Sequence, residues 1–356
     1  MTLSDILRHR LHNQHLTRPK YAAPADMVAW LGAVQAQDYP AAKWALGQRL
    51  RGASDASLEQ AFNDGAILRT HVMRPTWHFV APADIRWLLA LTAPRVRALM
   101  AYYDRQLQID AALFKRSHAV LTRALQGGKQ LTRTELDRAL QAAGIHQSGQ
   151  GVGHILMHAE LHALICSGPK RGKQFTYMLL EERVPPARPL DPDEALAELT
   201  RRYFTSHGPA LVPDFVWWSG LTAAQARHGL ELVKGDLAYE SIDGKHYWSS
   251  TARPLPMPTA AYLLPNYDEY TIAYKQREDF YDPTVFKTPL TRDNVPFANM
   301  IVRHGRIVGA WKRVLAKNAV ALETRFLHPA SEAEQAALAA AAARYGEFLG
   351  LPVEFS

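Results

Sequence analysis

The sequence predicts an α+β protein of three tandem winged-helix units followed by a small C-terminal β-barrel-like domain with a closing helix. Three observations lead to this prediction. The chain has 356 residues, which suggests more than one module of roughly 100–150 residues. Helices followed by a strand pair recur three times, and strand patterns dominate after residue 254. We place the units at residues 1–106, 107–185, 186–253 and 254–356.

The first unit begins with two helical patterns, over residues 3–17 and 26–36, where apolar side chains recur at helical spacing. The run SLEQAFNDG predicts a third short helix, with Ser57 as its N-cap and Gly65 as its stop. Residues 66–81 then alternate like a strand pair interrupted at Arg74-Pro75. Three helices followed by a two-stranded ribbon is the winged-helix order.

The second unit follows helical stretches over residues 82–91 and 94–106. Thr132 and Glu135 have the spacing of a capping box at a helix start. A further helix is expected over residues 151–165, and two strand-like runs then surround a turn rich in Gly, Pro and Lys. This order again predicts a winged helix, whose wing tip carries Lys170, Arg171 and Lys173.

The third unit begins after a proline-rich boundary over residues 184–194. Three helical patterns lead to a hairpin whose turn is Asp243-Gly244, a pair typical of two-residue turns. Beyond it, strand patterns include a turn at His304-Gly305. The closing helix has a capping box from Ser331 to Glu334 and ends near Gly350.

Composition restricts the class of protein. The chain has a net charge of +7, a pI near 9.4 and 15 histidines, which favours a polyanionic partner such as nucleic acid. No apolar run reaches the roughly 20 residues of a membrane helix, and the N-terminus lacks a secretory signal, so we expect a cytoplasmic, nucleoid-associated protein without membrane contact. Cys166 is the only cysteine. This excludes an intramolecular disulfide and predicts a buried apolar residue.

The stretch VQAQDYP places Gln35 and Gln37 two residues apart, before Asp38. On spacing alone, two such amides most simply satisfy loose backbone groups at the end of a helix. They can serve one site only if they lie outside regular helix, because residues two apart on a helix point about 200° apart. Pro40 also disfavours helical angles at Tyr39. We therefore expect a helix end or an irregular turn over residues 35–38.

Five ordered stretches resemble one known family. They are LGAVQAQDYPAAKWALGQRL, LRTHVMRPTWHFV, HGPALVPDFVWWSGL, LLPNYDEYTIAY and GRIVGAWKR. Together they resemble the bacterial tandem winged-helix DNA glycosylases that include the azinomycin-resistance glycosylase. This resemblance implies an enzyme that removes bulky alkylated purines and can unhook interstrand crosslinks. The family's catalytic motif is glutamine, apolar residue, glutamine, or a variant that ends in aspartate. Gln35-Ala36-Gln37 matches the first form, while Asp38 is out of register for the second.

The chemistry of such a substrate suits two amides. A purine alkylated at N7 or N3 is already cationic, so no general acid need protonate it. Hydrolysis then requires a positioned water and stabilisation of an oxocarbenium-like sugar. Amide oxygens of Gln35 and Gln37 accept hydrogen bonds and carry dipoles that can do both. The motif holds no lysine for a Schiff base, so we expect a monofunctional glycosylase without a lyase step.

Basic residues and one threonine predict where DNA binds. The candidates lie on the first wing, the second wing and the β-rich domain, and each could instead belong to a solvated face. They are Arg69, His71, Arg74, Thr76 and His78, then Lys170, Arg171 and Lys173, and finally Arg303, Arg306, Lys312 and Arg313. Asp268, next to Glu269, is a weaker candidate, because consecutive residues of a strand point in opposite directions.

A metal or another cofactor is not expected. His154, His158 and His162 form a stripe on one predicted helix, but no carboxylate or cysteine stands beside them at ligand spacing. The expected partner is double-stranded DNA that carries alkylated purines, bound by a monomer. The alternative is a winged-helix DNA binder without catalysis, such as a regulator or a DNA-protecting factor, and regulators usually dimerise to match a two-fold operator.

Overall fold

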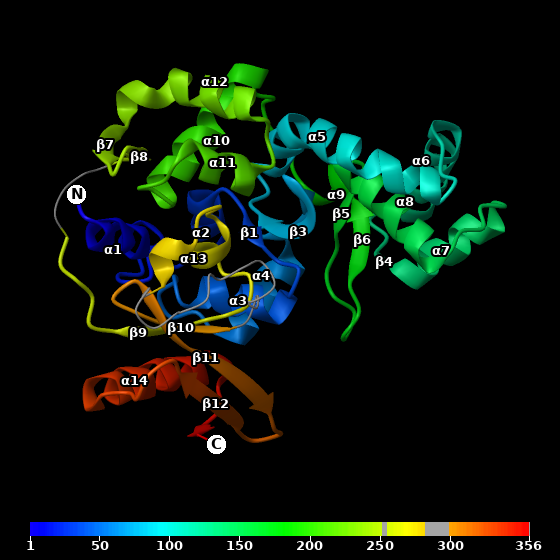
Figure 1. Cartoon of the computed structure of the whole chain (residues 1–356). Coiled ribbons are helices and arrows are strands. Elements are labelled where there is room, and N and C mark those ends of the chain that lie inside the picture. Colours follow the sequence, from blue (N-terminus) through cyan, green and yellow to red (C-terminus); the bar gives the residue numbers. More distant parts are fainter. Residues whose placement is uncertain (251–254, 282–298, 356) are drawn as a thin grey trace.

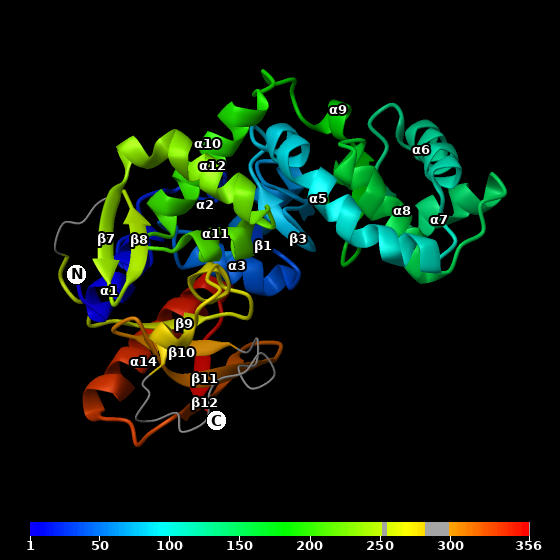
Figure 2. The same cartoon turned by 45° about the horizontal axis from the view of Figure 1, so that its top comes forward.

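The computed structural model describes residues 1–250, 255–281 and 299–355. Below, the first segment is residues 1–106, the second 107–185, the third 186–250 and the C-terminal part 255–281 and 299–355. The structure is α+β, and the first segment lies between the other parts (Figure 1). The second segment extends to one side, while the third segment and the C-terminal sheet lie against the first (Figures 1 and 2). The boundary that we expected at residue 254 is outside the described residues. Within the described ranges, no helix has both the length and the apolar character that a membrane crossing requires.

The first segment contains four helices and a three-stranded sheet before the long helix α5. They are α1 Leu3–Asn13, α2 Pro24–Leu31, β1 Val34–Gln35, α3 Tyr39–Gly47, α4 Asp55–Asp64, β2 Leu68–Val72, β3 Arg74–Val80 and α5 Ile85–Gln106. The helix α3 is absent from our sequence prediction. The N-cap of α4 is Ser54, and Ser57 completes its capping box from the third helical position, so the prediction of Ser57 as the cap was wrong. Gly65 ends this helix as predicted.

The second segment has the order helix, strand, two helices, two strands. Its elements are α6 Ala111–Leu125, β4 Leu131–Thr132, α7 Arg133–Ala142, α8 Gly149–Leu161, β5 Ile165–Ser167, β6 Thr176–Leu179 and α9 Leu180–Arg183. The strands form a sheet of order β4-β6-β5. Thr132 and Glu135 form the predicted capping box at the start of α7, and Cys166 is fully buried as predicted.

The third segment consists of three helices and a hairpin. They are α10 Pro192–Ser206, α11 Val212–Ser219, α12 Ala223–Val233, the short 3₁₀ helix η1 Lys234–Asp236, β7 Ala238–Ile242 and β8 Lys245–Ser249. The hairpin turns at Asp243 and Gly244, both with positive φ, as the sequence predicts. Gly220 ends α11, and a Cβ there would lie 2.2 Å from the carbonyl oxygen of Met73. Only glycine therefore allows the third segment to approach the β2–β3 turn this closely.

The C-terminal part is an open sheet, and the prediction of a barrel was wrong. Its elements are β9 Ala261–Leu264, α13 Glu269–Ile272, η2 Glu278–Phe280, β10 Met300–Arg303, β11 Arg306–Leu315, β12 Val320–Phe326, α14 Glu332–Leu349 and β13 Val353–Phe355. The order is β13-β12-β11-β10-β9, with β13 parallel to β12. Among the described residues, β9 and β13 form the two edges of this sheet and do not pair with each other. The helix α14 packs on β9. Apolar side chains of the sheet are therefore buried by a helix and not by closure of the sheet into a barrel.

Two apolar cores join the C-terminal part to the rest of the chain. One core unites the second, third and C-terminal parts with the first through residues such as Met73, Trp218 and Tyr270. The other packs Trp44 and Phe62 of the first segment against Trp311 and Tyr345. Because these cores cross segment boundaries, they hold the α13 turn rigidly against the β1 strand.

Candidate active site

The two candidate glutamines lie on the connection between α2 and α3, outside regular helix. The helix α2 ends at Leu31, where Gly32 has a φ of +82°. Gln35 is the last residue of the short strand β1, and Gln37 follows it in an irregular bend. The requirement that both residues lie outside helix is therefore confirmed.

The helix α3 begins at Tyr39, so the expected non-helical conformation of that residue was wrong. Pro40 occupies the first turn, where its missing N–H leaves no helical bond unmade. Asp38 is the N-cap, and its Oδ1 accepts a hydrogen bond from the Ala41 amide at 3.1 Å. Its carboxylate thus serves the helix start, in agreement with our decision not to assign it a catalytic role.

The strand β1 pairs antiparallel with β3, which places Gln35 opposite His78. The next residue, Ala36, donates its amide to the Trp77 carbonyl at 2.7 Å. The Oε1 of Gln37 in turn accepts a hydrogen bond from the Trp77 amide at 3.4 Å. Both glutamines are therefore fixed against one strand, with Gln35 9% exposed and Gln37 open to solvent.

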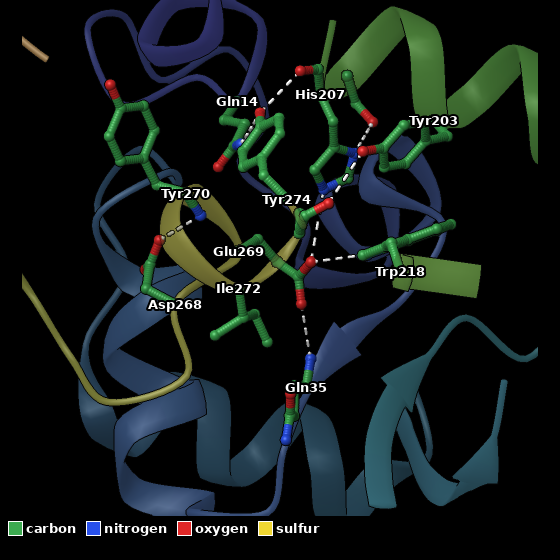
Figure 3. A network of polar contacts seen from close by, with 12 residues as sticks. Gln14, Gln35, Tyr203, His207, Trp218, Asp268, Glu269, Tyr270, Ile272 and Tyr274 are labelled. Carbon is green, nitrogen blue, oxygen red and sulfur yellow. Dashed lines mark hydrogen bonds and ion pairs between the residues drawn. The ribbon is translucent and has the colours of Figure 1, made fainter. Parts of the chain in front are cut away.

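Gln35 belongs to a closed ring of four hydrogen-bonded residues. Its backbone amide donates to Oε1 of Glu269 at 2.9 Å, and Oε2 of the same carboxylate accepts from the Trp218 indole at 2.8 Å (Figure 3). Arg74 completes the ring, because it donates to the Trp218 carbonyl and, at 3.3 Å, to Oε1 of Gln35. Backbone and side chain of Gln35 are thus both held by side chains from distant parts of the chain.

The carboxylate of Glu269 is almost completely buried, with 1% of its surface exposed. Burial acts to raise the pKa of Glu269, but the contact with His207, the Gln35 amide and the charge of Arg74 outweigh it, and the pKa lies below its usual value. The Nε2 of His207 lies 3.4 Å from Oε2 of Glu269. An ionised carboxylate is therefore present directly behind the candidate catalytic strand.

The hydrogen-bond donors fix how the two amides are oriented. A guanidinium and a backbone N–H can only donate, so the atoms that face Arg74 and the Trp77 amide must be the carbonyl oxygens of Gln35 and Gln37. Each oxygen retains a second lone pair. No group of the described residues accepts a hydrogen bond from either amide nitrogen, which leaves both free to contact a bound molecule.

His78 is neutral at the base of this site. It is fully buried, and burial together with the nearby charge of Arg74 lowers the pKa of His78 to about 3. Its Nδ1 donates to the Thr76 carbonyl at 2.9 Å, and its Nε2 accepts from Arg74 at 3.2 Å. The Thr76 hydroxyl oxygen is buried and has no hydrogen-bond partner among the described residues.

Arg69 and His71 support the β2–β3 hairpin. Arg69 donates to the Ala36 carbonyl at 2.9 Å, and its guanidinium lies 4.3 Å from the ring centre of Trp77. The Nδ1 of His71 forms a hydrogen bond with the buried carboxylate of Glu160 on α8. Both side chains are buried. Contact of either one with DNA stays a prediction, and both already hold the strand on which the glutamines rest.

The predicted DNA contacts elsewhere differ in how free they are. Lys170 pairs with Glu59 at 2.7 Å and Arg171 with Glu135 at 2.7 Å. Three of the predicted arginines in the C-terminal sheet are half-buried. Arg303 contacts the Glu334 carboxylate, Arg306 donates to the Tyr281 carbonyl, and Arg313 donates to the Tyr345 hydroxyl. Lys173 and Lys312 are exposed.

Glu269 is the site residue that the sequence prediction missed. The motif NYDEY drew attention to Asp268, but the chain there forms the helical turn α13 instead of a strand. Asp268 forms an ion pair with Arg49 at 2.7 Å, and both side chains are at most 1% exposed. Asp268 thus serves this buried ion pair, and Glu269 is the carboxylate that reaches Gln35. The adjacent pair of Asp268 and Glu269 was the signal in the sequence that a carboxylate could belong to the site. Which of the two side chains points towards Gln35 depended on the tertiary fold.

Comparisons with known proteins identify the class to which this chain belongs, the DNA glycosylases. A family model described as "DNA glycosylase AlkZ-like" matches residues 28–348, a range that includes Gln35, Gln37 and Glu269. The chain therefore belongs to the AlkZ-like DNA glycosylase family, and the resemblance seen in its sequence is confirmed.

A protein sequence and a solved structure, both from Streptomyces sahachiroi, are similar to most of the chain. The "Interstrand DNA cross-link repair glycosylase" is 24% identical in an alignment of 329 residues, and the alignment covers 87% of this chain and 87% of the relative. The solved structure of "Streptomyces sahachiroi DNA glycosylase AlkZ" matches with a TM-score of 0.79 and 21% identity, and the match covers 100% of both chains. At this identity the structural likeness shows the shared fold.

Proposed function

We propose that this glycosylase hydrolyses the N-glycosidic bond of bulky or cationic alkylated purines in duplex DNA, including N7 and N3 adducts and interstrand crosslinks. The observation that carries the proposal is the fixed pair Gln35 and Gln37, two neutral amides on one extended segment. The cross-link repair named for the Streptomyces relative supports the same class of substrate. The reaction is expected to end at an abasic site, without a lyase step.

Neutral amides suit a leaving group that is already positively charged. Departure of an N7-alkylated purine neutralises its charge, so a general acid is not required. The free lone pairs and amide nitrogens of Gln35 and Gln37 would hold a water beside the sugar and direct their dipoles at the developing oxocarbenium ion. A solvent-facing carboxylate at these positions would also attract the cationic base in the ground state, which adds no rate.

Glu269 and Arg74 would keep Gln35 in its productive position. The two groups carry opposite charges and hold the backbone and the side chain of Gln35. The hydrogen bonds of both groups hold Gln35 in place. Because their charges are opposite, the pair adds no net charge behind the strand. Such support of a reacting group by buried hydrogen bonds is what preorganised catalysis requires. We assign Glu269 and Arg74 as positioning residues.

Three winged-helix units, over residues 1–106, 107–185 and 186–253, are proposed to surround the duplex. The first segment places the glutamines beside its hairpin, and the second has the strand and helix order of a winged helix. Lys173 and Lys312 are exposed enough to contact phosphates. Val314 and Leu315 near the end of β11 are each 56% exposed, which favours apolar contact with a nucleic-acid groove. Arg303, Arg306 and Arg313 lie in the same sheet.

One experiment separates this function from a binding protein without catalysis. The chain is incubated with a duplex that contains N7-methylguanine, and with a duplex that carries a nitrogen-mustard crosslink. Abasic sites are then revealed by alkaline cleavage. We expect base release from both duplexes and no strand cleavage before alkali. Sequence-selective footprints without any base release would instead support a regulator, and strand cleavage before alkali would contradict the monofunctional assignment.

A further inference from the structure

Three histidines from two helices meet at a hollow in the second segment. His118 lies on α6, while His158 and His162 lie at the end of α8. One ligand nitrogen from each ring lies within 4.8 Å of the others. The hollow beside them has a volume of about 550 Å³. His154, which the sequence grouped with this stripe, instead pairs with Asp104 at 2.8 Å.

The nitrogens of two rings already face one another. The Nδ1 of His158 lies 3.0 Å from the Nε2 of His118. Two lone pairs cannot share this space, so a proton or a metal ion must lie between them. Two nitrogen ligands of a tetrahedral Zn²⁺ with bonds of about 2.0–2.1 Å lie roughly 3.3 Å apart. The observed separation is therefore close to the separation that the metal needs.

The third ring is oriented as a metal ligand usually is. The Nδ1 of His162 donates to the His158 carbonyl at 2.8 Å, which leaves the lone pair on Nε2. A backbone carbonyl that holds the other ring nitrogen is the usual outer contact of a ligating histidine. The Nε2 of His162 accepts a hydrogen bond from Arg97 at 2.6 Å, so a cation already occupies the third ligand position.

Neighbouring groups fix one of the three rings and also place positive charge near the site. His158 stacks on the ring of Phe114 with centres 3.5 Å apart, which fixes its plane. The hollow is also lined by Asp104, Arg105 and Lys115. The positive groups of Arg105 and Lys115, together with Arg97, oppose the metal.

We propose that His118, His158 and His162 bind a transition-metal ion, with Zn²⁺ as the best match. Imidazole ligands suit Zn²⁺, Cu²⁺ and Ni²⁺, and three ligands leave a fourth position for water from the hollow. The guanidinium of Arg97 takes the place of the metal at His162 and must move away when the ion binds. Because its ligands come from α6 and α8, the ion would fasten these helices together without taking part in base excision.

Calorimetric titration with Zn²⁺ and the visible absorption of bound Co²⁺ test this site. We expect one tight Zn²⁺ per chain and a loss of affinity of about a hundredfold in His118→Ala and His162→Ala. The matched control is His146→Ala, which removes an exposed histidine from the loop before α8 and should leave the affinity unchanged. Arg97→Ala should raise the affinity at least about tenfold, because it removes a competing cation.

A thermal melt with and without Zn²⁺ adds a measure that is independent of activity. Zn²⁺ should raise the Tm of the wild-type chain and of His146→Ala, but not that of His162→Ala, and circular dichroism verifies that each variant folds. Equal Zn²⁺ affinity in His162→Ala and the wild type would overturn the proposal. Absence of tight binding in both the wild type and Arg97→Ala would overturn it as well.

Discussion

Replacing Glu269 by glutamine tests the frame that holds Gln35. The substitution keeps the shape of the side chain but turns one of its two acceptor oxygens into a donor. Either the Gln35 amide or the Trp218 indole, now 2.9 and 2.8 Å from an oxygen, then faces another N–H group. A buried donor without an acceptor costs about 1–3 kcal/mol. The lost charge–dipole contacts add to this, so we expect a destabilisation of about 3 kcal/mol and a fall in Tm of roughly 5 °C.

The substitution should also slow catalysis in the molecules that remain folded. Once its amide is no longer anchored, Gln35 samples positions in which it cannot hold the water, and we expect single-turnover excision of N7-methylguanine to fall about ten- to hundredfold. The assay is run at a temperature at which most of the variant is folded. Circular dichroism measures this folded fraction. The rate is then expressed per folded molecule.

The neighbouring Asp268→Asn is the matched control. It leaves the buried Arg49 without its counter-charge, so we expect a loss of stability of about 3–5 kcal/mol. Asp268 does not contact Gln35, and excision per folded molecule should therefore stay near the wild-type rate. A wild-type rate in Glu269→Gln would refute the positioning role. Equal losses of rate in both variants would show that general destabilisation, and not the anchor of Gln35, explains the effect.

Two further predictions concern pH and salt. The pKa of His78 is about 3 in the folded chain, below its ordinary value of 6.5. Between pH 6.5 and pH 3 the unfolded chain therefore binds a proton at His78 that the folded chain does not bind. The free energy of unfolding should fall with decreasing pH in this range, by up to about 1.4 kcal/mol per pH unit. Urea unfolding at several pH values should show a shallower fall for His78→Gln, and an unchanged slope would contradict the assignment. Lys312→Ala should weaken binding to any duplex and reduce the slope of log affinity against log salt by about 0.9 if this exposed side chain contacts one phosphate; a slope equal to that of the wild type would remove Lys312 from the interface.

Local signals in the sequence were sufficient for many elements. Capping boxes at Thr132 and Ser331 and the Asp243-Gly244 turn form as predicted, because each depends on residues at most three positions apart. The non-helical position of Gln35 and Gln37 was also predictable, since the chemistry demanded that both amides serve one site. The exception close by was α3, whose first turn accepts Pro40.

The remaining features depend on residues that are far apart in the chain. Glu269 and Gln35 are separated by 234 positions, and no local pattern indicates which carboxylate of an adjacent pair will turn towards the site. The ion pair between Asp268 and Arg49 spans 219 positions. His118 likewise joins His158 only when α6 packs against α8. The open C-terminal sheet differs from the predicted barrel because strand patterns alone do not show whether edges meet.

We propose that Gln35 and Gln37 carry out hydrolysis of the glycosidic bond, while the rest of the fold binds DNA. Single-turnover excision of N7-methylguanine from a duplex tests it most directly, with duplex affinity measured in parallel. We predict that Gln35→Ala and Gln37→Ala each lower the rate about a hundredfold or more, with wild-type affinity. The exposed Gln60→Ala, on α4, should keep both values. Wild-type excision rates in Gln35→Ala and Gln37→Ala would contradict the claim.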